Sequence, residues 1–124
     1  MLFIFAMNAI EEKSFHFAVR IVKLCEYLGE DRKEYILSKQ LLRAETSIGA
    51  NVVEAQQAQS RADFVSKLSI ALKEASETNY WLRLLNATDY LSEAECSSIL
   101  MDCRELEKIL TSILKTTRNT PNKS

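Results

Sequence analysis

Apolar residues recur every three or four positions along most of this chain, which is the spacing that gathers them on one face of an α-helix. The pattern predicts four helices, over about residues 9–28, 33–58, 61–88 and 93–117. The last run is the most regular. Its apolar positions form a single stripe made of Cys96, Ile99, Leu100, Cys103, Leu106, Leu110, Ile113 and Leu114.

Signals for helix ends flank these runs. Ser60 and Ser92 are each followed three residues later by an acid, Asp63 and Glu95, which is the pattern of a capping box at a helix start. Gly29 is expected to end the first helix, since glycine is common just past a helix C-terminus. The domain organisation predicted is an N-terminal extension (1–8), a helical bundle (9–118) and a loose tail (119–124).

Two of the expected connections are short, and helices joined by short loops lie antiparallel beside one another. The predicted fold is therefore all-α, an antiparallel up-down-up-down four-helix bundle. Composition agrees, because 124 residues suit one domain and a chain with two Gly and one Pro has few residues for the tight turns of a β-protein. The apolar residues 1–8 either precede a natural start at Met7 or pack Phe3 and Phe5 against a neighbouring subunit.

Two of the predicted helices have more apolar surface than a single bundle can bury. On the helix at 33–58, the face with Leu41, Ile48 and Val52 is the core face, and a second line lies well away from it. The helix at 61–88 repeats this arrangement. The eight surplus positions are Tyr35, Leu42, Gly49, Val53, Ile70, Tyr80, Trp81 and Leu84.

Exposed apolar strips of this extent usually mark partner surfaces, so these eight residues are predicted to form a homo-oligomer interface. Gly49 costs about 1 kcal/mol relative to Ala inside a helix, and a close approach by another backbone or ring would explain its use. The alternative is that loops or the N-terminal extension cover the strip.

Polar residues near the core faces are expected to be structural. Asn51 and Asn79 are predicted to hydrogen-bond to each other or to nearby Ser and Thr residues, because a buried amide without partners is costly. Ser47 and Glu54 share a polar face with Arg43, and Glu54 is expected to be paired. The predicted structural polar motif is Ser47, Asn51, Glu54 and Asn79.

The charge balance gives no global attraction for nucleic acid, since 16 basic and 17 acidic residues leave a net charge of −1. Local contacts with RNA would need a patch of cations repeated in an oligomer. The alternative is that these cations form an ordinary solvated surface. The candidate nucleic-acid contacts are His16, Arg20, Lys23, Lys39, Arg43, Arg61, Lys67 and Lys73.

Motifs for catalysis or cofactor binding are missing from the sequence. His16 is the only histidine, the paired Glu-x-x-His motifs of bundle metal sites are absent, and no G-x-G or G-K-[ST] loop occurs. We therefore expect no enzyme activity, no metal and no cofactor. Cys25, Cys96 and Cys103 are expected to be reduced core thiols, with a reactive or intermolecular role as the alternative. No membrane span is expected, and the predicted location is cytoplasmic.

One stretch of the chain carries a family signature. It contains S-I-x-x-N-x-x-E, here Ser47, Ile48, Asn51 and Glu54, followed by ADFVSKLSIALKEASETNYWLRLL from Ala62. Together with KSFHFAVRIVKL at 13–24, it resembles the family of four-helix bundle proteins called 23S rRNA intervening sequence proteins. The resemblance covers about residues 12–114. One departure is Ala55, where the family commonly has Gly.

The resemblance implies a small bacterial protein that forms homopentameric rings and acts without catalysis as a scaffold or nucleic-acid-associated accessory. The family is also similar to the accessory variability protein of diversity-generating retroelements, a pentamer that binds a reverse transcriptase and nucleic acid. The partners implied are further copies of the chain and either structured RNA or an enzyme such as a reverse transcriptase. A protein-protein adaptor that never touches nucleic acid is the competing hypothesis.

Overall fold

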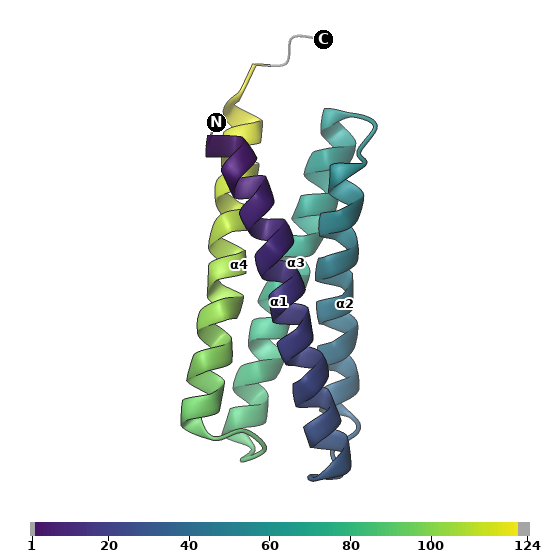
Figure 1. Cartoon of the computed structure of the whole chain (residues 1–124), viewed down its shortest axis with the longest axis vertical. Helices are drawn as coiled ribbons and strands as arrows, with labels where there is room; N and C mark the ends of the chain where they lie inside the picture. The colour runs from purple at the N-terminus through teal and green to yellow at the C-terminus, as the bar shows by residue number, and fades with distance from the viewer. Residues whose placement is uncertain (1, 122–124) are drawn as a thin grey trace.

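The computed structural model describes residues 2–121 and is all-α, with no strand in that range. Four helices form a bundle (Figure 1): α1 Leu2–Glu30, α2 Leu37–Gln56, α3 Arg61–Ala87 and α4 Glu93–Asn119. The predicted all-α class and the number of helices are confirmed. The last residues of the predicted tail, 122–124, lie outside the described residues.

Neighbours in the chain are also neighbours in space. α1 packs on α2, α2 on α3 and α3 on α4, and α1 also contacts α4. Figure 1 places the N-terminus, the α2–α3 connection and the end of α4 at one end of the bundle. The α1–α2 and α3–α4 connections lie at the other end. Each helix therefore has one outer face, and it contacts a neighbouring helix along each of its two edges.

Both predicted capping boxes begin a helix. The Ser60 hydroxyl accepts a hydrogen bond from the Asp63 amide at 3.0 Å, and Asp63 accepts one from the Gln59 amide at 3.3 Å. At α4, the Ser92 hydroxyl accepts from the Glu95 amide at 3.2 Å and donates to the Glu95 carboxylate at 2.9 Å. These contacts satisfy amides that a helix start leaves free.

The start of α2 corrects the prediction, which placed it at residue 33. Lys33 has a φ of 54°, a conformation that a right-handed helix cannot contain. The buried Glu34 carboxylate then accepts hydrogen bonds from the amides of Ile36, Leu37 and Ser38 at 2.7–3.0 Å. A glutamate two to four residues ahead of the free amides therefore takes the place of a Ser, Thr or Asp cap. The helix ends at Gln56, before the predicted 58.

The first helix is longer than predicted at both ends. It begins at Leu2, so the described part of the predicted extension is continuous with α1, and it runs through Glu30. Phe3 packs against Phe64 of the same chain, with ring centroids 5.8 Å apart, and Ile10 is fully buried. Gly29 does not end the helix, because its φ is not positive and the helix continues through Glu30. None of the described helices has the length and apolar content of a membrane span.

The core is made of the stripes that the periodicity predicted. All eight positions of the α4 stripe are buried, and Leu41, Ile48 and Leu68 at the centre of the bundle are fully buried. A group of half-buried residues packs around them, including Leu37, Phe64, Val65 and Leu72. The core of one chain is therefore complete, and any surplus apolar surface lies outside it.

Candidate functional site

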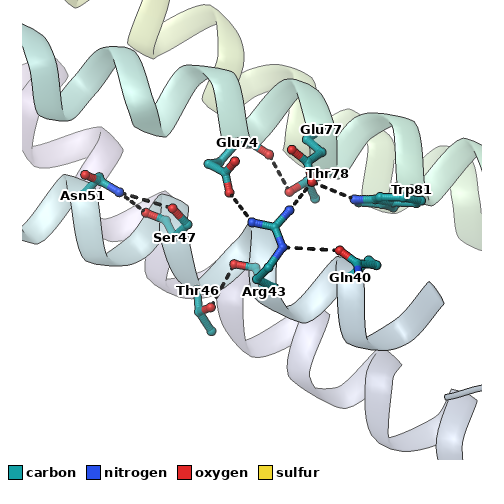
Figure 2. A network of polar contacts seen from close by, with 9 residues as sticks. All are labelled: Gln40, Arg43, Thr46, Ser47, Asn51, Glu74, Glu77, Thr78 and Trp81. Carbon is teal, nitrogen blue, oxygen red and sulfur yellow. Dashed lines mark hydrogen bonds and ion pairs between the residues drawn. The ribbon is translucent and has the colours of Figure 1, made fainter. Parts of the chain in front are cut away.

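The contact between α2 and α3 is closed by a polar network (Figure 2). Arg43 of α2 donates to Glu74 of α3 at 3.1 Å and also to Glu77. Gln40 accepts from the same guanidinium at 3.4 Å, and the Trp81 indole N–H donates to Glu77 at 3.3 Å. Glu74 is buried, so Arg43 neutralises a carboxylate that could not be left alone in the core. Arg43 thus has a structural role in this network.

The signature residues at 47–54 have structural contacts as well. Asn51 donates to the Ser47 carbonyl at 2.8 Å and to its hydroxyl at 3.3 Å, which agrees with the expected partnership with a Ser neighbour. Ile48 is fully buried. Glu54 pairs with Lys67 of α3 at 3.1 Å. Glu54, Glu74 and Glu77 are therefore each matched with a cation.

Asn79 differs from the prediction that it bonds to Asn51 or to a hydroxyl. Its amide donates to Glu107 of α4 at 3.0 Å, and its oxygen accepts from Arg83 at 2.8 Å. Ser76 also donates to Glu107, at 3.5 Å. The position of Asn79 on its helix therefore predicted that it is partly buried, but it did not identify α4 as the helix that it faces.

The edge between α1 and α2 is open and apolar. A hollow of about 600 Å³ lies there. Phe15 and Val53 are 68% and 62% exposed on its sides, and a Cβ added to Gly49 would meet nothing within 4 Å. We call this hollow the α1–α2 groove; it is lined by Ser14, Phe15, Ala18, Gly49, Val52 and Val53, and along one side by the polar residues Asn8, Glu11, Glu12 and His16 of α1.

The apolar surface of α1 was not predicted as part of the interface. Phe15, Val19 and Val22 are all exposed, and their spacing of four and three residues gives them one helix face. This signal was present in the sequence. The sequence prediction missed it because the apolar periodicity of that helix defined only its core face. The apolar residues next to that face were not considered.

The eight predicted interface residues divide between two regions of the chain. Gly49 and Val53 line the α1–α2 groove, whereas Trp81 lies beside the Arg43 network, as Figure 2 shows. Trp81 packs against the core of its own chain, so it is not a free anchor. Exposure is high for Tyr35, Ile70 and Tyr80, and Leu42 and Leu84 are half-buried.

One carboxyl group of α2 is buried without a full set of partners. Glu45 of α2 is 1% exposed, and its Oε1 has no hydrogen-bond partner in the described structure. Burial raises the pKa of this carboxyl to about 7. Cys25 of α1 lies close enough that the charges of Glu34 and Glu45 add to the effect of burial, which together raise the pKa of the Cys25 thiol to about 11.

The other two thiols are also protected from ionisation. Burial raises the pKa of Cys103 to about 12, with Glu107 adding to the effect, and it raises the pKa of Cys96. All three cysteines are free. Within residues 2–121, no group of three or more His, Cys, Asp and Glu side chains is arranged to hold a metal ion. The polar side chains described above therefore serve mainly to connect neighbouring helices.

Comparison with known families decides what this bundle is. The sequence matches the family described as 23S rRNA-intervening sequence protein over residues 7–112, a range that contains the signature residues, all of α2 and α3 and most of α1 and α4. The chain belongs to this family. The family assignment from the signature at 47–54 is confirmed.

A relative of this family member has been solved by crystallography at 1.70 Å resolution. It is described as a protein with unknown function from the S23 ribosomal protein family of Bacteroides thetaiotaomicron VPI-5482. It shares 55% identity, with a TM-score of 0.88, over 89% of this chain and 98% of its own. A comparison with curated proteins finds no match.

The cations predicted to contact nucleic acid do not form one surface in this family member. Besides Arg43, Arg20 binds Asp102 at 2.7 Å, Lys67 binds Glu54, and Arg61 donates to the carbonyls of Thr117 and Thr120. His16 is exposed and lies 3.9 Å from Glu12. The three lysines that complete the set, Lys23, Lys39 and Lys73, are exposed on three different helices.

Proposed function

We propose that this chain is a non-enzymatic scaffold, an antiparallel up-down-up-down bundle that assembles into a homo-oligomer and acts as a nucleic-acid-associated accessory in the cytoplasm. The observation that carries the assembly is the α1–α2 groove. Its walls expose Phe15 and Val53, and its floor contains Gly49 with free space above it. A second copy of the chain would remove this apolar surface from water.

A ring is the form of assembly that fits the distribution of apolar surface. A closed ring needs two different, complementary patches on each copy, because head-to-tail contacts repeat the same pair of surfaces. One patch is the groove, and the exposed Ile70 of α3 supplies apolar surface for the other. The pentamer implied by the family resemblance is the ring size that we propose.

The nucleic-acid part of the proposal is supported by the family, whose description refers to intervening sequences of 23S rRNA. The second candidate is a protein-protein adaptor, with a reverse transcriptase among the partners that the resemblance implies. It is favoured by a specific observation, because four of the eight cations predicted as RNA contacts are bound to acids or carbonyls of the same chain.

Light scattering on the purified protein tests the assembly. The wild-type chain is expected to have a mass several times that of one copy, and Gly49→Leu is expected to shift the mass toward a monomer by filling the groove. Ala50→Leu is the matched control, since this exposed neighbour lies on another side of α2 and should preserve the oligomer. A wild-type protein that stays monomeric at millimolar concentration would overturn the scaffold proposal.

A further inference from the structure

The outer face of α4 carries a row of cations that the prediction did not include. Arg104, Lys108, Lys115 and Arg118 are all exposed, and their spacings of four, seven and three residues place them along one side of the helix. From first to last the row covers 14 residues, or about 21 Å of helix. We call these four residues the basic row.

Three acids in the middle of the same helix contact its neighbours, while Glu93 and Glu95 lie exposed in its first turn. Asp102 binds Arg20 of α1, and Glu105 binds Lys13 of α1 at 2.7 Å. Glu107 faces α3, where it accepts hydrogen bonds from Asn79 and Ser76. The two carboxylates at the α1 edge are thereby neutralised within the chain, and Glu107 is the acid that remains beside the row.

The cations of the basic row are not paired with acids in the described structure, although Glu107 lies beside them. No ion pair within residues 2–121 involves any of its four side chains, and Arg118 makes one hydrogen bond, to the Ser69 hydroxyl at 3.3 Å. This distinguishes the row from Arg20, Arg43 and Lys67, which are held by carboxylates of neighbouring helices.

An aromatic side chain adjoins the row on α3. The Arg83 guanidinium lies 5.7 Å from the centre of the Tyr80 ring, and Tyr80 is 49% exposed. Asn79 links this pair to α4, because it bonds both Arg83 and Glu107. Cations beside an exposed aromatic ring are the combination with which proteins hold an RNA backbone and stack an unpaired base.

We propose that the basic row, with the Arg83–Tyr80 pair at its edge, binds the phosphate backbone of RNA. The proposal rests on the nucleic-acid role in the proposed function and gives that role a surface. RNA is favoured over an acidic protein because the cations form a line and an aromatic ring lies beside them. Binding of this kind is independent of sequence, and an oligomer repeats the row once in each copy.

The test compares two variants that each remove two exposed lysines. Lys108→Gln with Lys115→Gln neutralises half of the basic row, and Lys23→Gln with Lys39→Gln is the charge-matched control on α1 and α2, which also tests two of the contacts predicted from the sequence. The probe is a fluorescein-labelled RNA hairpin with an unpaired loop, titrated by fluorescence anisotropy between about 50 and 200 mM salt. Circular dichroism and light scattering verify that both variants keep their helices and their mass.

The row variant is expected to bind the hairpin roughly tenfold more weakly than wild type at the lowest salt. Its plot of log affinity against log salt should be shallower by about 1.4 to 1.8, the change for two lost phosphate contacts. The control should stay close to wild type. Adding Tyr80→Ser to the row variant should further weaken binding to the loop and leave the salt dependence unchanged.

Each other outcome has a defined meaning. Equal losses in both variants would overturn the α4 surface and leave the nucleic-acid role of the protein standing. A wild-type protein that does not bind the hairpin at low salt would overturn both the α4 surface and the nucleic-acid role, whatever its oligomeric mass. Binding of poly-glutamate through the row, without binding of RNA, would overturn the proposal in favour of an acidic protein partner.

Discussion

The two edges of α2 differ in how they are closed. Toward α3, Arg43 and Glu54 each pair with charged side chains of the facing helix, and the contact is complete within one chain. Toward α1, the edge has an open apolar groove and a buried carboxyl, Glu45, with an oxygen that lacks a partner. The first edge holds the bundle together. The second edge is the surface on which we propose that another copy of the chain packs.

The largest difference between the two edges should come from Glu45. Its folded pKa of about 7 lies above the ordinary 4.5, so the folded chain binds a proton that the unfolded chain releases. The contribution to stability is therefore complete below pH 4.5 and is lost as the pH rises through 7. The loss amounts to roughly 3 kcal/mol at most.

Glu45→Gln removes this titration. The free energy of unfolding of the variant, minus that of wild type, should increase by roughly 3 kcal/mol between pH 4.5 and pH 8. Urea denaturation at several pH values measures it, and taking the difference cancels the titration of the other groups. A difference that is independent of pH would mean that Glu45 stays charged in the folded chain.

The next effect belongs to the α2–α3 edge. Arg43→Met leaves the buried Glu74 carboxylate without its cation, and we expect a loss of roughly 2 kcal/mol at pH 7. Because Arg43 is itself 51% exposed, the loss is smaller than for a fully buried pair. Urea denaturation checks it, with Lys39→Met as the control at an exposed lysine.

A double variant sharpens this prediction. Glu74→Gln added to Arg43→Met should recover part of the lost stability, because the uncompensated charge is gone. If the single variant is as stable as wild type, the buried pair has no role in closing the edge.

The smallest effect is expected at the other ion pair of the same edge. Lys67 and Glu54 are 30% and 54% exposed at their side chains, so water screens their attraction. Lys67→Met should cost less than about 1 kcal/mol, and the cost should shrink further in high salt. A loss of stability as large as that of Arg43→Met would show that solvent exposure does not determine which of the two ion pairs contributes more to stability.

Sequence reasoning predicted the helices well because their signals are local. Ser60 and Ser92 act within three residues of themselves, and the α4 stripe needs only the helical period to be recognised. The start of α2 was wrong for the same reason, since the Glu34 cap depends on a left-handed turn at Lys33 that no local preference announced.

The candidate site was harder to predict because it depends on which helices face each other. The helical period placed Arg43 on the same polar face as Ser47, but the partners of Arg43 are on α3. Likewise, the exposed Phe15 of α1 matters because it lines the groove together with Gly49 and Val53 of α2. Distances between helices are absent from a periodic pattern.

The sequence by itself determined the four helices, the core stripes and the family, because each follows from residues close together in the chain. The tertiary structure alone decided which cations are paired with acids of the same chain and which are not. Arg20 and Arg104 are both arginines on amphipathic helices, yet one is bound to Asp102 and the other is exposed in the basic row. The reason is that a charge is compensated by whichever helix lies next to it, and that neighbour is chosen by packing of the whole core.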